Sequence, residues 1–171
     1  MLKTKKGLST IIEVTIIILL TVILIVFVGS FILSWAREKL QKTECSNYIG
    51  YFSFSHSFPN CYQRNNNIGQ YEYNIFIKRK ENTQPNIAGF KLVFISNNNI
   101  ETIEVINNTS PTNKISMKEG LGIPLTLPEA GQTKAYSYKS QNLFKSIKVM
   151  PITNSRDVCQ ETDTIESILQ C

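Results

Sequence analysis

The strongest pattern in the sequence is a long apolar segment near the N-terminus. Positions 14–36 hold 23 residues without an ionisable group. A bilayer core about 30 Å thick is crossed by roughly 20 apolar residues in a helix, and within lipid only a helix satisfies all the backbone amides of a single segment. The segment is also longer than the apolar core of roughly 7 to 15 residues in a cleaved secretory signal. We therefore predict a retained membrane-spanning helix.

From Tyr48 onward the apolar residues recur with a period of two, which is typical of half-buried strands. Clusters of Asn, Gly and Pro separate the alternating segments. About seven short strands are predicted, at 48–58, 71–78, 90–95, 102–106, 123–127, 133–139 and 146–152. Beyond Lys42, only 157–169 is a candidate for a further short helix. The fold class is therefore α+β: a long N-terminal hydrophobic helix followed by an antiparallel β-sandwich, immunoglobulin-like in its number of strands.

Net charge changes this picture little. The formal charge is +5, but three of the 18 basic residues lie within the first six positions. After Lys42 the densest basic group is 78–80, which we interpret as a solvated strand end. No nucleic-acid partner is therefore expected.

The cysteines indicate which end of the helix lies outside the cytoplasm. Basic residues do not, because three precede the helix and three follow it closely. Disulfides form outside the reducing cytoplasm, and all four cysteines follow the helix: Cys45, Cys61, Cys159 and Cys171. We expect a membrane anchor with an extracellular C-terminal domain. Two overlapping N-glycosylation sequons, at Asn107 and Asn108, are compatible with this location.

Glu13 is a charged residue at the start of the apolar segment. A carboxylate near lipid is costly and is usually paired or functional. One interpretation places it at the headgroup level, where the dipole at a helix start favours an acid. The other pairs it with a positive group on a neighbouring subunit, and both interpretations stay open.

The N-terminal residues, Lys5-Lys6-Gly7-Leu8-Ser9-Thr10-Ile11-Ile12-Glu13 before the apolar run, resemble the class III signal peptide of type IV pilins. They are most similar to the archaeal form, in archaeal pilins and archaellin-like proteins. The resemblance implies that a prepilin peptidase cuts between Gly7 and Leu8, beside Lys6, and that the helix stays on the mature protein. It implies a leader at 1–7, a membrane and filament-core helix at 8–42 that packs with other pilin subunits, and an extracellular β-sandwich at 43–171.

Four cysteines allow three disulfide pairings. We expect the two local ones, Cys45 with Cys61 and Cys159 with Cys171. Zinc sites use closely spaced Cys and His residues, whereas these cysteines are far apart and the only histidine is His56. Neither a metal nor a cofactor is therefore expected.

No catalytic constellation emerges from the sequence. His56 lies between serines without an identified carboxylate to orient it, and Glu101 and Glu104 are expected on a polar strand face. We interpret the acidic residues within 157–166 as a solvated loop. We therefore expect a non-enzymatic subunit of an archaeal type IV pilus-type filament, serving adhesion or surface assembly. The alternative is an uncleaved single-pass anchor that displays an extracellular binding module. A cell-surface hydrolase that depends on His56 or on a pair of carboxylates is a third hypothesis.

Overall fold

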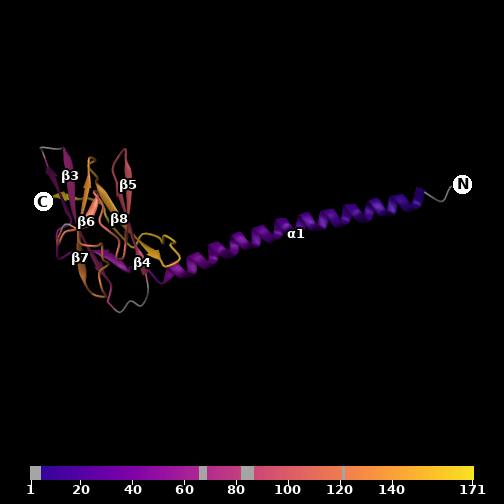
Figure 1. The fold of residues 1–171 in the computed structure, drawn as a ribbon, viewed down its shortest axis with the longest axis horizontal. Helices are drawn as coiled ribbons and strands as arrows, with labels where there is room; N and C mark the ends of the chain where they lie inside the picture. Colours follow the sequence, from indigo (N-terminus) through magenta and orange to yellow (C-terminus); the bar gives the residue numbers. More distant parts are fainter. Residues whose placement is uncertain (1–4, 66–68, 82–86, 121) are drawn as a thin grey trace. The chain divides into compact units, whose positions relative to one another are not determined.

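The chain divides into two compact units, one ending at Thr43 and the other running from Glu44 to Cys171. The first is a single helix, and the second contains two β-sheets (Figure 1). The computed structural model describes residues 5–65, 69–81, 87–120 and 122–171. Within this part only the backbone is described at positions 5–11, 37–38 and 40–44. One long N-terminal helix followed by two β-sheets confirms the predicted α+β class.

Helix α1 (Lys5–Ser46) is 42 residues long and contains the apolar segment Ile12–Ala36. Four hydroxyl side chains lie within this segment, and three of them turn back onto their own helix. The hydroxyls of Thr15, Thr21 and Ser30 donate hydrogen bonds of 2.8 Å to the carbonyl oxygen three residues earlier. Because these polar groups are satisfied within the helix, the segment suits apolar surroundings.

Ten strands form the two sheets of the second unit within its described residues. They are β1 (Phe52–Phe54), β2 (Cys61–Asn65), β3 (Gln70–Arg79), β4 (Ile87–Ile95), β5 (Ile100–Ile106), β6 (Ile115–Met117), β7 (Thr133–Ser140), β8 (Ser146–Thr153), β9 (Asp163–Ile165) and β10 (Leu169–Gln170). The first sheet, called sheet A, has the order β10-β2-β3-β7-β6, with β1 also paired to β3. Sheet B has the order β5-β4-β8-β9. Strands β10 and β2 pair in parallel, and the other described strand pairs are antiparallel.

Six of the seven predicted strands overlap observed ones, whereas the prediction at 123–127 is wrong. That segment contributes only an isolated bridge between Thr109 and Leu125. Strands β2, β6, β9 and β10 were not predicted. Three of them have only two or three residues, too few for an alternating pattern, and β2 ends in three exposed polar residues. Segment 157–169 contains β9 and the first residue of β10 instead of a helix.

Aromatic side chains join the two sheets at the centre of the sandwich. The ring of Phe94 on β4 stacks on Tyr138 of β7 at 4.0 Å between centroids, and Phe90 meets Tyr136 edge-on at 5.3 Å. All four side chains are 0–1 % exposed. Such ring pairs each contribute about 0.5–1.5 kcal/mol beyond the burial of their area. The regular alternation of β3, β4 and β7 therefore builds one shared core.

The buried tyrosines keep their hydroxyl groups hydrogen-bonded. The Tyr136 hydroxyl donates to the carbonyl of Thr126 at 2.7 Å. The Tyr73 hydroxyl donates to the carbonyl of Asn142 and accepts from the backbone amide of Phe144. Burial raises the pKa of Tyr73 to about 12, so this phenol stays protonated at neutral pH. Satisfied hydroxyls allow tyrosine to fill a core in which phenylalanine alone would leave backbone groups unpaired.

Gly89 permits a close approach between β4 and β5. The β4–β8 register shifts between Ile87 and Gly89. A Cβ atom at Gly89 would lie 2.1 Å from the carbonyl oxygen of Val105. The irregularity therefore requires a residue without a side chain.

The disulfides pair residues that are far apart in the sequence. Cys45 bonds to Cys159, and Cys61 bonds to Cys171. The expected pairings of Cys45 with Cys61 and of Cys159 with Cys171 are therefore wrong. The parallel pairing of β10 with β2 places Leu169 opposite Cys61 and thereby brings Cys171 beside it. Sequence spacing does not reveal this proximity, because strand pairing creates it.

Peptide mapping tests the two long-range pairings. Digestion of the unreduced protein is expected to yield linked peptides joining Cys45 to Cys159 and Cys61 to Cys171. The closed segments span 114 and 110 residues, and a loop of roughly 100 residues is worth about 4.7 kcal/mol in the chain-entropy model. Replacing Cys61 and Cys171 together by serine should therefore lower the free energy of unfolding by about 3–5 kcal/mol. A linked peptide joining Cys45 to Cys61 would contradict the observed topology.

Candidate functional site

The apolar segment Ile12–Ala36 of α1 is the most extensive exposed hydrophobic surface among the described residues. Its 25 residues make it long and apolar enough to cross a membrane, and none of its most apolar stretch is buried within the chain. Its large side chains are 50–74 % exposed and point in all directions around the helix axis. A helix that is apolar on every side is normally covered by lipid or by other helices. The segment is therefore of a kind that suits lipid or the apolar faces of other helices.

The residues predicted for processing lie at the start of this helix. The backbone of Lys6, Gly7 and Leu8 is helical, and their side chains lie outside the described part. Glu13 is exposed on α1. Its two interpretations, a headgroup-level acid or a partner for a neighbouring subunit, stay predictions. Glu13 directly precedes the uninterrupted apolar run at 14–36, so the carboxylate lies beside the exposed apolar surface of the helix.

The candidate catalytic residues are not brought together. His56 lies in the loop between β1 and β2 and is exposed. Across the described part of the chain, no three His, Cys, Asp or Glu side chains converge in a manner that could hold a metal ion. In the acidic segment, Asp163 accepts a hydrogen bond from the backbone amide of Phe54, and Glu161 forms an ion pair with Lys148. These two carboxylates therefore have structural partners.

Both sequon asparagines lie in the turn after β5 and are exposed. The Asn107 side-chain oxygen accepts a hydrogen bond of 3.2 Å from the Leu127 amide, and the Asn108 amide donates to the Leu125 carbonyl at 2.7 Å. Asn108 has a φ of 60°, a left-handed conformation that asparagine tolerates better than most residues. The Asn107 side chain thus links the turn to Leu127, whereas Asn108 contributes through its backbone. Both asparagines are exposed.

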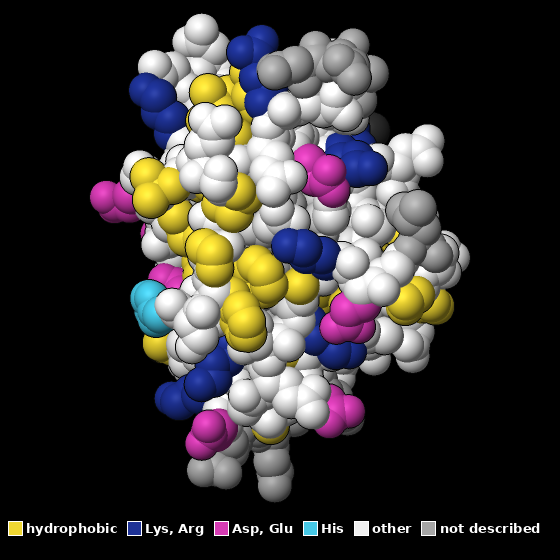
Figure 2. Space-filling model, turned by 90° about the vertical axis from the view of Figure 1, so that its left-hand side faces the viewer, with side chains coloured by type: hydrophobic (Ala, Val, Ile, Leu, Met, Phe, Trp, Pro, Cys, Tyr) yellow, Lys and Arg dark blue, Asp and Glu magenta, His cyan; other side chains and the backbone are white. Residues whose placement is uncertain are grey.

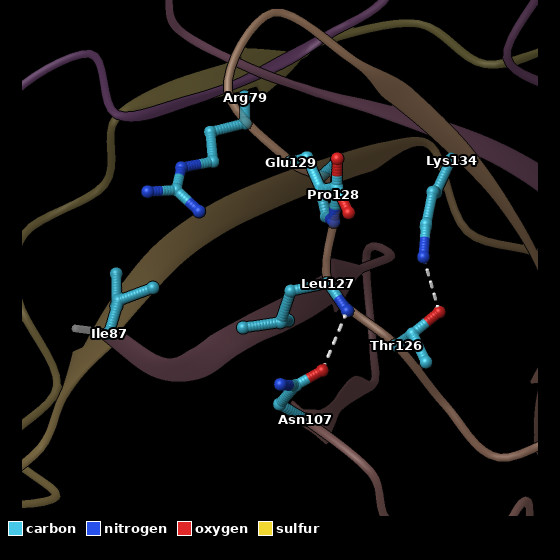
Figure 3. A pocket seen from close by; sticks show the side chains of 8 residues that line it. All are labelled: Arg79, Ile87, Asn107, Thr126, Leu127, Pro128, Glu129 and Lys134. Atoms are coloured by element: carbon cyan, nitrogen blue, oxygen red, sulfur yellow. Dashed lines mark hydrogen bonds between the residues drawn. The ribbon is translucent and has the colours of Figure 1, made fainter. Parts of the chain in front are cut away.

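A pocket of about 540 Å³ adjoins this turn (Figure 3). The residues that line it combine an apolar group with opposite charges: Arg79, Ile87, Asn107, Thr126, Leu127, Pro128, Glu129 and Lys134. Lys134 donates to the Thr126 hydroxyl at 2.5 Å, and the Arg79 guanidinium lies 4.8 Å from the centre of the Tyr51 ring. Glu129 accepts a hydrogen bond from Gln132. Because these internal contacts engage the charged groups, we assign the pocket no ligand.

Glu101 connects the two sheets through a set of polar contacts that the sequence did not predict. It lies opposite Phe94 in the β4–β5 register, so it faces the sandwich interior, whereas Glu104 lies opposite Lys91 and pairs with it at the surface. The expectation that both acids share a polar face is therefore wrong. The Glu101 carboxylate accepts hydrogen bonds from Tyr138 (2.5 Å), Asn142 (2.7 Å) and Ser140 (2.9 Å), and Lys114 lies 3.4 Å away.

These contacts favour the ionised form of Glu101. Partial burial alone would raise its pKa, but the three hydrogen bonds and the Lys114 charge outweigh that effect and lower the pKa to about 2. Burial, together with the hydrogen bond to Glu101, raises the pKa of Tyr138. The Glu101 carboxyl group, with its lowered pKa, accepts a hydrogen bond from a phenol whose pKa is raised, and it therefore acts as a structural hydrogen-bond acceptor. We assign Glu101 a role in stabilising the sandwich.

Comparison with known proteins gives no match to this chain. This holds for protein-family models, for curated proteins and for solved structures. The functional assignment therefore depends on the architecture and chemistry of the chain itself.

The low pKa of Glu101 predicts a specific dependence of stability on pH. Because folding lowers this pKa from 4.5 to about 2, the stabilisation is present above pH 4.5 and is lost as the pH falls towards 2. Glu101→Gln should lower the free energy of unfolding by about 1–3 kcal/mol at pH 7, because donors would be left unpaired. The difference from wild type should shrink in acid, as measured by denaturant unfolding of the full chain in nonionic detergent. Glu104→Gln is the matched control, and an equal loss in both variants would refute the network's role.

The left-handed backbone at Asn108 gives a second stability prediction. Asn108→Gly should change the free energy of unfolding by less than about 0.5 kcal/mol, since glycine adopts positive φ freely. Asn108→Val should cost about 1–3 kcal/mol, because a β-branched residue is strained there. The exposed Asn113, which does not have a positive φ, supplies the control Asn113→Val. Equal effects of valine at both positions would argue against a special backbone at Asn108.

Proposed function

We propose that this chain is a pilin-like structural subunit of an archaeal type IV pilus-type surface filament that serves adhesion or surface assembly. The observation that carries the proposal is an apolar helix, exposed on all sides, joined directly to the disulfide-bonded second unit of the chain, Glu44–Cys171, which we call the β unit. In this proposal α1 packs with the helices of other subunits, and the β unit forms the outer surface. The helix resides in the membrane before assembly.

The location follows from two features. An N-terminal apolar helix acts as a signal or an anchor, and disulfides persist only outside the reducing cytoplasm. Together they indicate that the β unit is an extracellular domain. The finer proposal is that a prepilin peptidase removes residues 1–7 at the cytoplasmic face and leaves Leu8 as the new N-terminus.

The length of α1 favours a filament core over a simple anchor. At 1.5 Å per residue, a helix of 42 residues extends about 63 Å, roughly twice the thickness of a bilayer core. The helix continues for ten residues beyond Ala36, the end of the apolar segment. A single-pass anchor needs only the apolar part, whereas a packed bundle uses the whole length to separate its core from the β units.

The proposal assigns the chain no catalytic activity, no cofactor and no nucleic-acid partner. Its partners are the membrane, the prepilin peptidase and other pilin subunits of the same or a related kind. The second candidate is an uncleaved single-pass anchor that displays a binding module. A groove on the outer face of sheet A is compatible with both candidates, so cleavage of the leader is the property that distinguishes them.

The N-terminus of the protein recovered from its native membrane tests the proposal. Intact mass and N-terminal sequencing should show a chain that begins at Leu8. Replacement of Gly7 by leucine should block the cut, because it removes the glycine on which the peptidase acts, and should leave a chain that begins at Met1. Gly29→Ala is the matched control, since a Cβ atom at Gly29 meets nothing within 4 Å, and this variant should be processed normally. A wild-type chain that begins at Met1 would replace the filament proposal with the uncleaved anchor.

A further inference from the structure

We propose that the outer face of sheet A, the face turned away from sheet B, carries a binding groove for an acidic polysaccharide. The inference is independent of filament assembly, because it depends only on the β unit. The groove has a volume of about 320 Å³. The residues that line it are mostly polar: Gln63, Glu72, Asn74, Ser116, Met117, Lys118, Gly120, Ser137 and Lys139.

Strand register explains why the polar side chains share one face. Asn74 of β3 lies opposite Ser137 of β7, and Ser137 lies opposite Ser116 of β6. Glu72 lies opposite both Gln63 of β2 and Lys139 of β7. Residues that pair across strands point to the same side of a sheet. Two adjacent rows of amide, hydroxyl and charged groups therefore cross sheet A on its outer side.

The floor of the groove is polar and nevertheless buried. Asn74 is 8 % exposed and Ser137 is 5 % exposed, although both lie on the face that does not contact sheet B. Ser137 donates to Glu72 at 2.6 Å, whereas the Asn74 amide nitrogen has only a long contact of 3.7 Å to Cys171 Sγ. Among the described residues the side-chain oxygen of Asn74, Oδ1, accepts no hydrogen bond, and no fully buried side-chain polar atom lacks a partner. This oxygen is therefore open to the groove and available to a ligand hydroxyl.

The rim supplies further groups without partners of their own. Within the part of the chain that the structure describes, the side chains of Gln63, Ser116 and Lys139 form no hydrogen bond or ion pair. Lys139 lies opposite Glu72, yet Glu72 bonds to Ser137 instead. These groups offer amide, hydroxyl and ammonium donors together with amide and carboxylate oxygens. Such a mixture matches the hydroxyl groups of a sugar, each of which both donates and accepts hydrogen bonds.

An aromatic pair lies next to the groove on the same face. Phe76 follows Asn74 by two positions on β3, so both point outward. Its ring stacks on Phe58 at 5.1 Å, and the Lys118 ammonium lies 5.2 Å from the Phe76 ring. Phe58 is 49 % exposed. An exposed ring beside polar groups offers a flat apolar surface to the C–H face of a sugar ring. Figure 2 views this side of the β unit and shows hydrophobic side chains gathered among charged ones.

Charge selects an acidic ligand. The groove contains two lysines and one carboxylate, and that carboxylate is hydrogen-bonded to Ser137. Lys139 has no counter-charge within ion-pair distance among the described residues, whereas Lys91, Lys114 and Lys148 elsewhere on the sandwich do. A ligand carboxylate can complete this charge balance. A sugar polymer that carries carboxylates, such as a polyuronate, combines the required hydroxyls, ring faces and negative charge.

Binding of a short oligogalacturonate to the full chain in nonionic detergent tests this proposal. Titration calorimetry should give a dissociation constant below about 1 mM. The neutral, methyl-esterified form of the same oligomer should bind at least about five-fold more weakly, because it lacks the carboxylates. Lys139→Gln should weaken oligogalacturonate binding by about three- to five-fold, and the double variant with Lys118→Gln by about ten-fold or more. Phe58→Ala should weaken the charged and the neutral oligomers alike.

Matched controls distinguish specific binding in the groove from nonspecific electrostatic attraction. Lys145→Gln removes an equal charge from an exposed lysine outside the groove, and its affinity should match that of wild type. Thermal unfolding should show that Lys139→Gln and Lys145→Gln are equally stable. Equal losses at Lys139 and Lys145, or equally tight binding of a DNA oligonucleotide of the same charge, would overturn the proposal. Absence of binding at about 1 mM oligogalacturonate would also overturn it.

Discussion

The contact between Phe94 and Tyr138 is the interaction on which the rest of the sandwich depends. It joins the central strand β4 of sheet B to β7 of sheet A. The hydroxyl of the same tyrosine donates a hydrogen bond to Glu101 on the edge strand β5. One side chain therefore packs in the core and also links sheet A to the edge of sheet B. The two sheets pack through their inner faces, so the outer face of sheet A takes no part in joining them. Its polar groups can therefore form a groove, while α1 interacts separately with its surroundings.

The sequence predicted those elements whose pattern is long enough to be measured. The apolar segment of α1 and the alternation along β3, β4 and β7 each extend over many residues, so their periods stand out from chance. Strands of two or three residues, such as β6 and β10, carry no such signal. They form because longer neighbours present unpaired backbone groups to them. Their existence is thus a property of the assembled sheet and not of their own residues.

The disulfides and Glu101 were mispredicted for a related reason. Cys61 and Cys171 meet because β10 pairs with β2, and no local spacing encodes that pairing. Glu101 and Glu104 differ by an odd number of positions on one strand, so they point to opposite faces. This difference was accessible from the alternation of β5. That Tyr138, Ser140 and Asn142 converge on Glu101 was not, because it depends on how the two sheets pack together.

The two disulfides also determine how the β unit responds to mechanical load. Cys45 lies in the last turn of α1 and is bonded to Cys159, beyond β8. Tension applied between the helix and Cys171 passes through this bond and along residues 159–171, and it also reaches β2, because Cys171 is bonded to Cys61. The two disulfides can then separate by no more than the length of the residues between Cys159 and Cys171, about 40 Å of extended chain. Tensile force of that kind would therefore extend β9 and β10 and pull on β2, but the strands between Cys61 and Cys159, which contain the aromatic core, could not be drawn out beyond this length.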